Sequence, residues 1–124
     1  MGKGQGFTLV ELLITIGICG LLLIFSFPAL SQLRSALYLE ASSRGIASDL
    51  RKTQALAVCQ NENRSWEISA FMLPAGINEF NRKTFVFSGS GSTPPGGNGT
   101  QILSDRSGHC KRIVVSSAGR VRIE

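Results

Sequence analysis

The sequence predicts an α+β protein in which one long N-terminal helix packs, by its second half, against a small and mainly antiparallel β-sheet. Three features predict this fold. Residues 12–30 form an uncharged apolar run, residues 31–60 carry an amphipathic helical pattern, and residues 61–124 combine strand-like segments with glycine- and proline-rich connections. Because the chain has 124 residues and the apolar run uses many of them, only one small globular domain fits.

The apolar run reads LLITIGICGLLLIFSFPAL from Leu12 to Leu30, 19 residues without a charge. A helix that rises about 1.5 Å per residue needs roughly this length to cross a ~30 Å hydrocarbon core. A secretory signal peptide would instead have a shorter apolar region followed by a small-residue cleavage site. The run therefore predicts a single membrane span. Lys3 places the N-terminus in the cytoplasm and the chain after Arg34 on the far side of the membrane.

Two residues interrupt the helical pattern within this run. Gly20 is a poor helix former and Pro28 cannot donate to the helical ladder, so we expect a kink or a melted segment between them. Beyond them, residues 31–60 continue as a helix. Its apolar stripe is predicted to contain Leu39, Ile46, Leu50 and Ala57, with Glu40, Arg44, Arg51 and Lys52 among the polar positions.

The remaining chain follows a strand pattern. Apolar and polar residues alternate from Trp66 to Met72, which predicts a strand that ends before Pro74. Ala118–Gly119 reads as a two-residue connection within a hairpin. Residues 88–99 (SGSGSTPPGGNG) have the composition of a flexible loop. Further strands are expected at Thr84–Phe87, Gln101–Leu103, Lys111–Ser116 and Arg120–Ile123.

The polar residues offer little for catalysis or metal binding. His109 is the only histidine, and no acid/base pair or nucleophile constellation accompanies it. Cys59, His109 and Cys110 lack a fourth ligand and the CxxC spacing of a zinc site. We therefore expect no enzyme activity, no metal and no cofactor.

Two cysteines lie outside the apolar run. Cys59 follows the predicted helix and Cys110 opens a predicted strand, so in an oxidising compartment a disulfide would join the two elements. The alternative is a pair of unpaired buried thiols.

The N-terminal motif Gly6-Phe7-Thr8-Leu9-Val10-Glu11-Leu12 resembles the prepilin signature of type IV pilins and type II secretion pseudopilins. The resemblance implies cleavage after Gly6 by prepilin peptidase, N-methylation of Phe7, and a role for Glu11 in assembly. The helix-breaking pair Gly20 and Pro28 also matches this family. The position of the Glu11 carboxylate in an apolar helix also suggests a functional role for it, because such a charge is costly in lipid. The alternative is that Thr8-x-x-Glu11 is a capping box.

The C-terminal half is similar to the GspH/FimT group of minor pilins and pseudopilins. The similarity rests on FVF at residues 85–87, the glycine-rich loop, GTQIL at residues 99–103 and RIVVSSAGRVRI at residues 112–123. It implies a type IV pilin-like chain with a leader at residues 1–6, a transmembrane and filament-core helix half at 7–30, an amphipathic half at 31–60 and a periplasmic β-rich domain at 61–124. The implied partners are other pilin subunits, prepilin peptidase and the inner membrane.

Gly119-Arg120-Val121-Arg122 resembles the GRxR pattern of FimT-type minor pilins that bind DNA. In a strand, Arg120 and Arg122 project from one face about 7 Å apart. Lys111 and Arg112 would widen this basic patch, and the formal net charge of +5 suits a polyanion. We expect DNA binding without sequence specificity. The alternatives are that the arginines only protect a terminal strand from aggregation, and that the chain is a GspH-like structural pseudopilin of a type II secretion system.

Overall fold

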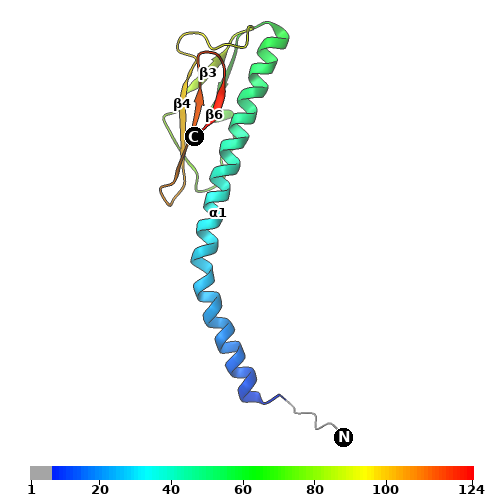
Figure 1. The fold of residues 1–124 in the computed structure, drawn as a ribbon, viewed down its shortest axis with the longest axis vertical. Coiled ribbons are helices and arrows are strands. Elements are labelled where there is room, and N and C mark those ends of the chain that lie inside the picture. Colours follow the sequence, from blue (N-terminus) through cyan, green and yellow to red (C-terminus); the bar gives the residue numbers. More distant parts are fainter. Residues whose placement is uncertain (1–6) are drawn as a thin grey trace. The chain divides into compact units, whose positions relative to one another are not determined.

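The computed structural model describes residues 7–124, so the predicted leader at residues 1–6 lies outside the described residues (Figure 1). The chain forms two compact units, one that ends at Leu33 and one that comprises Arg34–Glu124. One long helix is followed by short strands, which confirms the predicted α+β class. The elements are α1 Leu9–Gln60, β1 Arg64–Glu67, a 3₁₀ turn Ile68–Ala70, β2 Asn78–Phe80, β3 Thr84–Phe87, β4 Gly99–Ser104, β5 Cys110–Val115 and β6 Val121–Ile123.

The part of α1 in the first unit exposes its apolar side chains all around. Their exposed fractions lie between 51 and 75% from Phe7 to Leu33. The helix continues through Gly20 and Pro28, so the segment between them is not melted, and the expected kink stays a prediction. One proline removes one backbone hydrogen bond, and many other bonds hold a helix of 52 residues. The hydroxyl of Ser31 also donates to the carbonyl of Pro28 at 2.9 Å.

The second half of α1 lies alongside the strands within the Arg34–Glu124 unit (Figure 1). The predicted apolar stripe is confirmed, because Leu39, Ile46, Leu50 and Ala57 are all buried. Packing explains the glycine at position 45, because a Cβ there would lie 2.8 Å from Cζ of Phe71. Buried apolar side chains of the strands belong to the same core as this stripe, among them Phe85, Phe87, Leu103, Ile113 and Val115.

The strands form two antiparallel sheets. One has the order β1-β3 and the other the order β2-β4-β5-β6. The predicted strand from Trp66 to Met72 is wrong in length, because β1 ends at Glu67 and the 3₁₀ turn follows. Its alternation continues into that turn, where Ile68 is buried without strand pairing. β2 was not predicted from the sequence, and its three residues pair with β4.

A buried amide connects the two sheets. Gln101 in β4 is completely buried, and its side chain donates to the carbonyl of Phe80 at 3.0 Å. The same side chain accepts a hydrogen bond from the backbone N–H of Lys83 at 3.3 Å. Phe80 ends β2 and Lys83 precedes β3. Gln101 therefore satisfies backbone groups at the crossing between sheets, where no strand partner is available.

The last two strands form the predicted hairpin, with a longer connection than expected. The backbone N–H of Ser116 donates to the carbonyl of Arg120 at 3.0 Å, so the loop between these two residues has three residues instead of two. Gly119 has φ +80°, the left-handed conformation that ends such a three-residue loop. The hairpin register pairs Val115 with Val121.

The glycine-rich loop makes specific contacts although its composition predicts flexibility. Thr93 is buried, and its backbone N–H donates to the carbonyl of Ser117 in the hairpin loop at 3.0 Å. The side chain of Gln54 in α1 donates to the carbonyl of Gly91 at 2.6 Å. The loop thus joins α1 to the β5–β6 hairpin, while its flexibility remains a prediction.

Candidate functional site

The N-terminal candidates Phe7 and Glu11 are both exposed. The backbone N–H of Glu11 donates to Oγ1 of Thr8 at 3.2 Å, which is one half of the expected capping box. Among the described residues, the carboxylate of Glu11 has no hydrogen-bond or ion-pair partner. A helix cap therefore accounts for Thr8 and leaves the carboxylate available to another chain. Gly6 lies outside the described residues.

The C-terminal arginines lie at the end of the β5–β6 hairpin. Arg120 and Arg122 are exposed, whereas Val121 between them is only 7% exposed and Ile123 packs against the core. The two arginines therefore occupy outward positions of one strand segment, as the alternation predicts. The backbone N–H of Arg120 donates to Oγ of Ser116 at 3.1 Å.

Lys111 and Arg112 point to opposite faces of β5, so the predicted four-residue patch does not form. Lys111 shares its face with the buried Ile113, and its Nζ lies 3.2 Å from Oε2 of Glu40 in α1. Hydrogen bonds from Lys111 and then from Arg44 hold the pKa of Glu40 below its usual value. Lys111 is thus engaged with α1, and only Arg112 stays on the outward face with the hairpin arginines.

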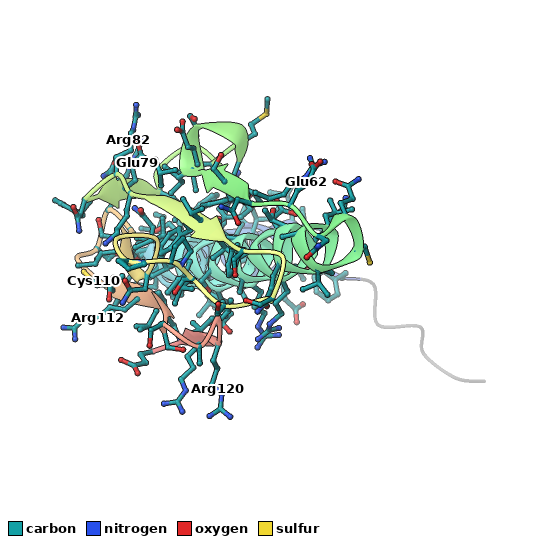
Figure 2. The ribbon with its side chains drawn as sticks, turned by 90° about the horizontal axis from the view of Figure 1, so that it is seen from above. Glu62, Glu79, Arg82, Cys110, Arg112 and Arg120 are labelled. Carbon is teal, nitrogen blue, oxygen red and sulfur yellow. The ribbon has the colours of Figure 1, made fainter. Side chains whose placement is uncertain are left out.

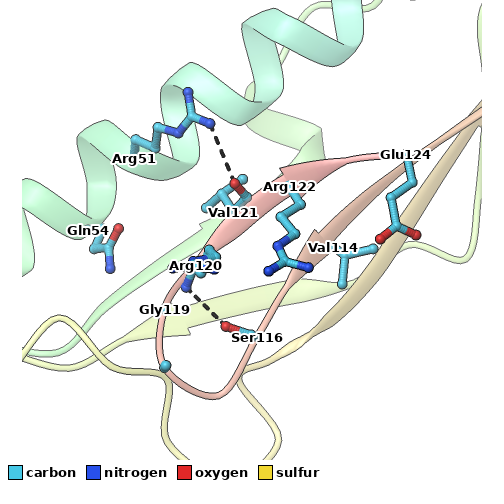
Figure 3. A pocket seen from close by; sticks show the side chains of 10 residues that line it. Arg51, Gln54, Val114, Ser116, Gly119, Arg120, Val121, Arg122 and Glu124 are labelled. Carbon is cyan, nitrogen blue, oxygen red and sulfur yellow. Dashed lines mark hydrogen bonds between the residues drawn. The ribbon is translucent and has the colours of Figure 1, made fainter.

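Sequence analysis missed Arg51 as a member of this region. Nη2 of Arg51 donates to the carbonyl of Val121 at 3.4 Å, across the free edge of β6 (Figure 3). An open groove of about 810 Å³ lies between α1 and the hairpin and is lined by Arg51, Arg120, Arg122 and Glu124, among other residues. One feature of the sequence could have indicated Arg51. It directly follows Leu50, a buried residue of the apolar stripe, and therefore borders the contact between the helix and the sheet.

Gly119 is required by the packing of this hairpin. A Cβ at Gly119 would lie 2.1 Å from the carbonyl oxygen of Gly91 and 2.5 Å from Nε2 of Gln54. Its φ of +80° also disfavours any residue with a side chain. The glycine that precedes the two arginines therefore brings the hairpin loop against the Gly91 loop.

Residues 1–27 match the prokaryotic N-terminal methylation motif. The match supports a type IV pilin-like protein that is processed by prepilin peptidase and assembles with other pilins. The motif points to a structural subunit rather than an enzyme. The chain has no significant match among curated proteins, and none among solved structures.

The helix α1 fits a membrane anchor. By its length and composition, α1 is long and apolar enough to cross a membrane. Together with the methylation motif, this fits a membrane-anchored pilin.

The predicted disulfide is not formed in this structure, where Cys59 and Cys110 are both free and exposed. Cys110 directly precedes Lys111, which bonds to Glu40, so this end of β5 docks near residue 40 of α1. Cys59 lies 19 residues further along the helix. At about 1.5 Å per residue, this places it roughly 28 Å further along the helix axis. A disulfide requires Cα atoms within about 7 Å.

The turn between β4 and β5 is held against α1 by a buried carboxylate. Burial raises the pKa of Asp105, but hydrogen bonds from His109, Ser35 and Ser107 outweigh burial and leave the pKa below its usual value. Nδ1 of His109 lies 3.0 Å from Oδ2 of Asp105, and Oγ of Ser35 lies 3.1 Å from the same oxygen. Within residues 7–124, no three or more His, Cys, Asp or Glu residues come together in a way that could hold a metal ion.

Proposed function

We propose that the chain is a minor pilin or pseudopilin of a type IV filament-family machine. Prepilin peptidase cleaves it after Gly6 and methylates Phe7, α1 anchors it in the inner membrane with its C-terminal domain in the periplasm, and the same helix then enters the filament core. The methylation motif at residues 1–27 carries this proposal. The apolar side chains that α1 exposes support it, since they need either lipid or other helices around them.

Mass spectrometry tests the processing. In cells with an active prepilin peptidase, the mature chain should begin at methylated Phe7 and lack the first six of the 124 residues. An intact Met1 under those conditions contradicts the proposal.

Glu11 pairs with the amine of Phe7 on a neighbouring subunit in this proposal. An unpaired carboxylate in an apolar helix is costly in lipid, and a free amine on another helix would offset that cost. Glu11→Ala should insert into the membrane but fail to enter filaments. Thr8→Ala is the matched control, because it removes the helix cap and keeps the carboxylate. Filament entry should survive in Thr8→Ala, and normal entry of Glu11→Ala would contradict the pairing.

DNA is the proposed ligand of the hairpin region. Arg51, Arg120 and Arg122 line one groove against the single carboxylate side chain of Glu124. Arginine is well suited to bind phosphate oxygens because its planar guanidinium donates in pairs. Contacts of this kind favour DNA without reading its sequence.

The salt dependence of binding tests this ligand. Full-length protein in a nonionic detergent should bind duplex DNA with an affinity that falls steeply with salt. Replacing both Arg120 and Arg122 by Gln should reduce the log–log salt slope by about 1.8, at ~0.9 for each phosphate contact.

The matched control for this experiment replaces Arg44 and Arg82 by Gln. These arginines form ion pairs with Glu40 and Glu79, each at 2.7 Å, away from the groove. The control changes the net charge equally, so it should keep the wild-type slope apart from a small general charge effect. Equal slopes for both double variants contradict a local DNA site.

The second candidate function is a GspH-like structural pseudopilin of a type II secretion system. One observation favours it, because two residues of the hairpin region have roles in the fold that need no DNA. Gly119 permits the close packing of two loops, and Arg51 covers the edge of β6. In that case the variant lacking Arg120 and Arg122 should support secretion normally, and the wild type should bind no DNA.

A further inference from the structure

The four-stranded sheet has an outward face on the side opposite the buried core residues of its strands. The register places Phe80, Ile102 and Arg112 side by side across β2, β4 and β5. The neighbouring row joins Val114 to Arg122. These positions alternate with the buried Leu103, Ile113 and Val115, so they face away from the core. We call the set formed by Phe80, Ile102, Arg112, Val114 and Arg122 the outer sheet face.

The outer sheet face exposes an aromatic ring on a flat strand surface. Phe80 is 56% exposed, and Ile102 beside it is half-buried. Val114 is also half-buried and continues the apolar surface toward the hairpin. A large exposed aromatic side chain next to further apolar residues indicates an interaction surface.

Arginines border this apolar surface on the hairpin side. Arg112 and Arg122 lie on the face itself, and Arg120 extends it beyond the start of β6. Arg112 and Arg120 project outward in Figure 2. One acidic residue, Glu124, lies beside them, because its backbone pairs with that of Arg112. Glu79, on the other side of β2, is bound to Arg82. The face therefore combines a positive border with an apolar centre.

We propose that the outer sheet face binds single-stranded DNA, with a base stacked on Phe80 and phosphates on Arg112 and Arg122. This inference rests on the proposed DNA binding and names the form of DNA that the site takes. A single strand offers both a polyanionic backbone and unpaired base faces, and base stacking on aromatic side chains is tolerant of sequence. A duplex keeps its base faces stacked inside, so it could use the arginines but not Phe80.

The dimensions of the sheet agree with this arrangement. Phe80 and Arg112 are two strands apart, which is about 10 Å at ~4.8 Å per strand. A base on the ring and its backbone on the arginines can therefore lie across the same face. A neighbouring pilin subunit fits this face less well, because it would bury three arginines, Arg112, Arg120 and Arg122, beside the one carboxylate of Glu124. Buried charges without a partner are strongly destabilising.

Binding of short oligonucleotides to full-length protein in nonionic detergent tests the proposal. Phe80→Leu keeps an apolar side chain but removes the stacking ring, so the Kd for a thymidine 20-mer should rise at least about fivefold. The Kd for a duplex of equal length should change less than twofold. Phe80→Trp should retain or tighten single-strand binding. Met72→Leu is the control, because Met72 is 94% exposed and lies outside every strand, and it should change neither Kd.

The outcomes separate this proposal from the DNA binding on which it rests. If Phe80→Leu and Phe80→Trp both bind the 20-mer like the wild type, while binding still depends on Arg120 and Arg122, the stacking site is refuted and DNA binding stands. If Phe80→Leu impairs filament assembly alone, a neighbouring subunit covers the face and the proposal is also refuted. If the wild type binds neither form of DNA, the proposed DNA function itself fails.

Discussion

Replacing Gly119 by Ala should destabilise the C-terminal domain by about 2–4 kcal/mol. The left-handed conformation at φ +80° costs an alanine about 1–2 kcal/mol. In addition, the new Cβ would lie 2.1 Å from the carbonyl oxygen of Gly91, so the two loops must separate. Their separation breaks the 2.6 Å hydrogen bond from Gln54 to Gly91, a further loss of roughly 0.5–1.5 kcal/mol. Loss of packing around the two loops raises the sum of these two contributions to the expected range.

The chain offers a matched control for the conformational part of this cost. Gly108 has φ +86°, and a Cβ there would meet no atom within 4 Å. Gly108→Ala therefore isolates the backbone strain, about 1–2 kcal/mol, from the steric clash. The difference between the two variants measures the close approach of the hairpin to the Gly91 loop.

Thermal unfolding followed by circular dichroism in nonionic detergent measures both effects. For a domain of this size, about 1 kcal/mol corresponds to roughly 4–8 °C in Tm. We expect Gly119→Ala to melt well below Gly108→Ala, and Gly108→Ala somewhat below the wild type. Equal melting temperatures for the two variants would show that the hairpin does not need this close contact.

Three further predictions concern Gln101, Asp105 and the two exposed cysteines of the C-terminal unit. Replacing Gln101 by Leu should destabilise the domain by roughly 1–3 kcal/mol, measured by thermal unfolding, because the backbone N–H of Lys83 loses its partner in a buried site. The folded state holds the pKa of Asp105 below its usual value, so the stabilising effect of this carboxylate is complete above the usual pKa and is lost as pH falls through the lower folded pKa. The melting temperature of the wild type should therefore fall more steeply on acidification than that of Asp105→Asn, and parallel pH profiles would contradict this. Thiol titration of the unreduced protein should find that Cys59 and Cys110 both react with the reagent. If neither thiol reacts, the result would support a disulfide between them.

Much of the fold could be predicted because local patterns express it directly. The stripe of Leu39, Ile46 and Leu50 follows the helical period, and Thr84–Phe87 has a strand pattern that the structure reproduces with the same bounds. The strand at residues 66–72 was overestimated because alternation continues into the 3₁₀ turn, where Ile68 is buried by tertiary contacts. β2 was missed because three residues carry too little pattern to identify a strand.

The candidate site could be predicted only in part. Alternation along one strand correctly placed Arg120 and Arg122 outward. The same alternation places Lys111 and Arg112 on opposite faces of the strand, since Lys111 lies two residues from the buried Ile113 and shares its face. Arg51 could not be assigned to the site, because its contact with Val121 spans 70 residues of sequence.

The sequence by itself determined the apolar helix, the processing motif and the alternation of the C-terminal strands, because each depends on residues close together in the chain. Only the tertiary structure could place β5 at residue 40 of α1, which separates Cys110 from Cys59. Only it brings Arg51 to the hairpin and aligns Phe80 with Arg112 across the sheet. These placements depend on how side chains from distant segments pack and on the register between strands, and periodicity within one segment does not specify either.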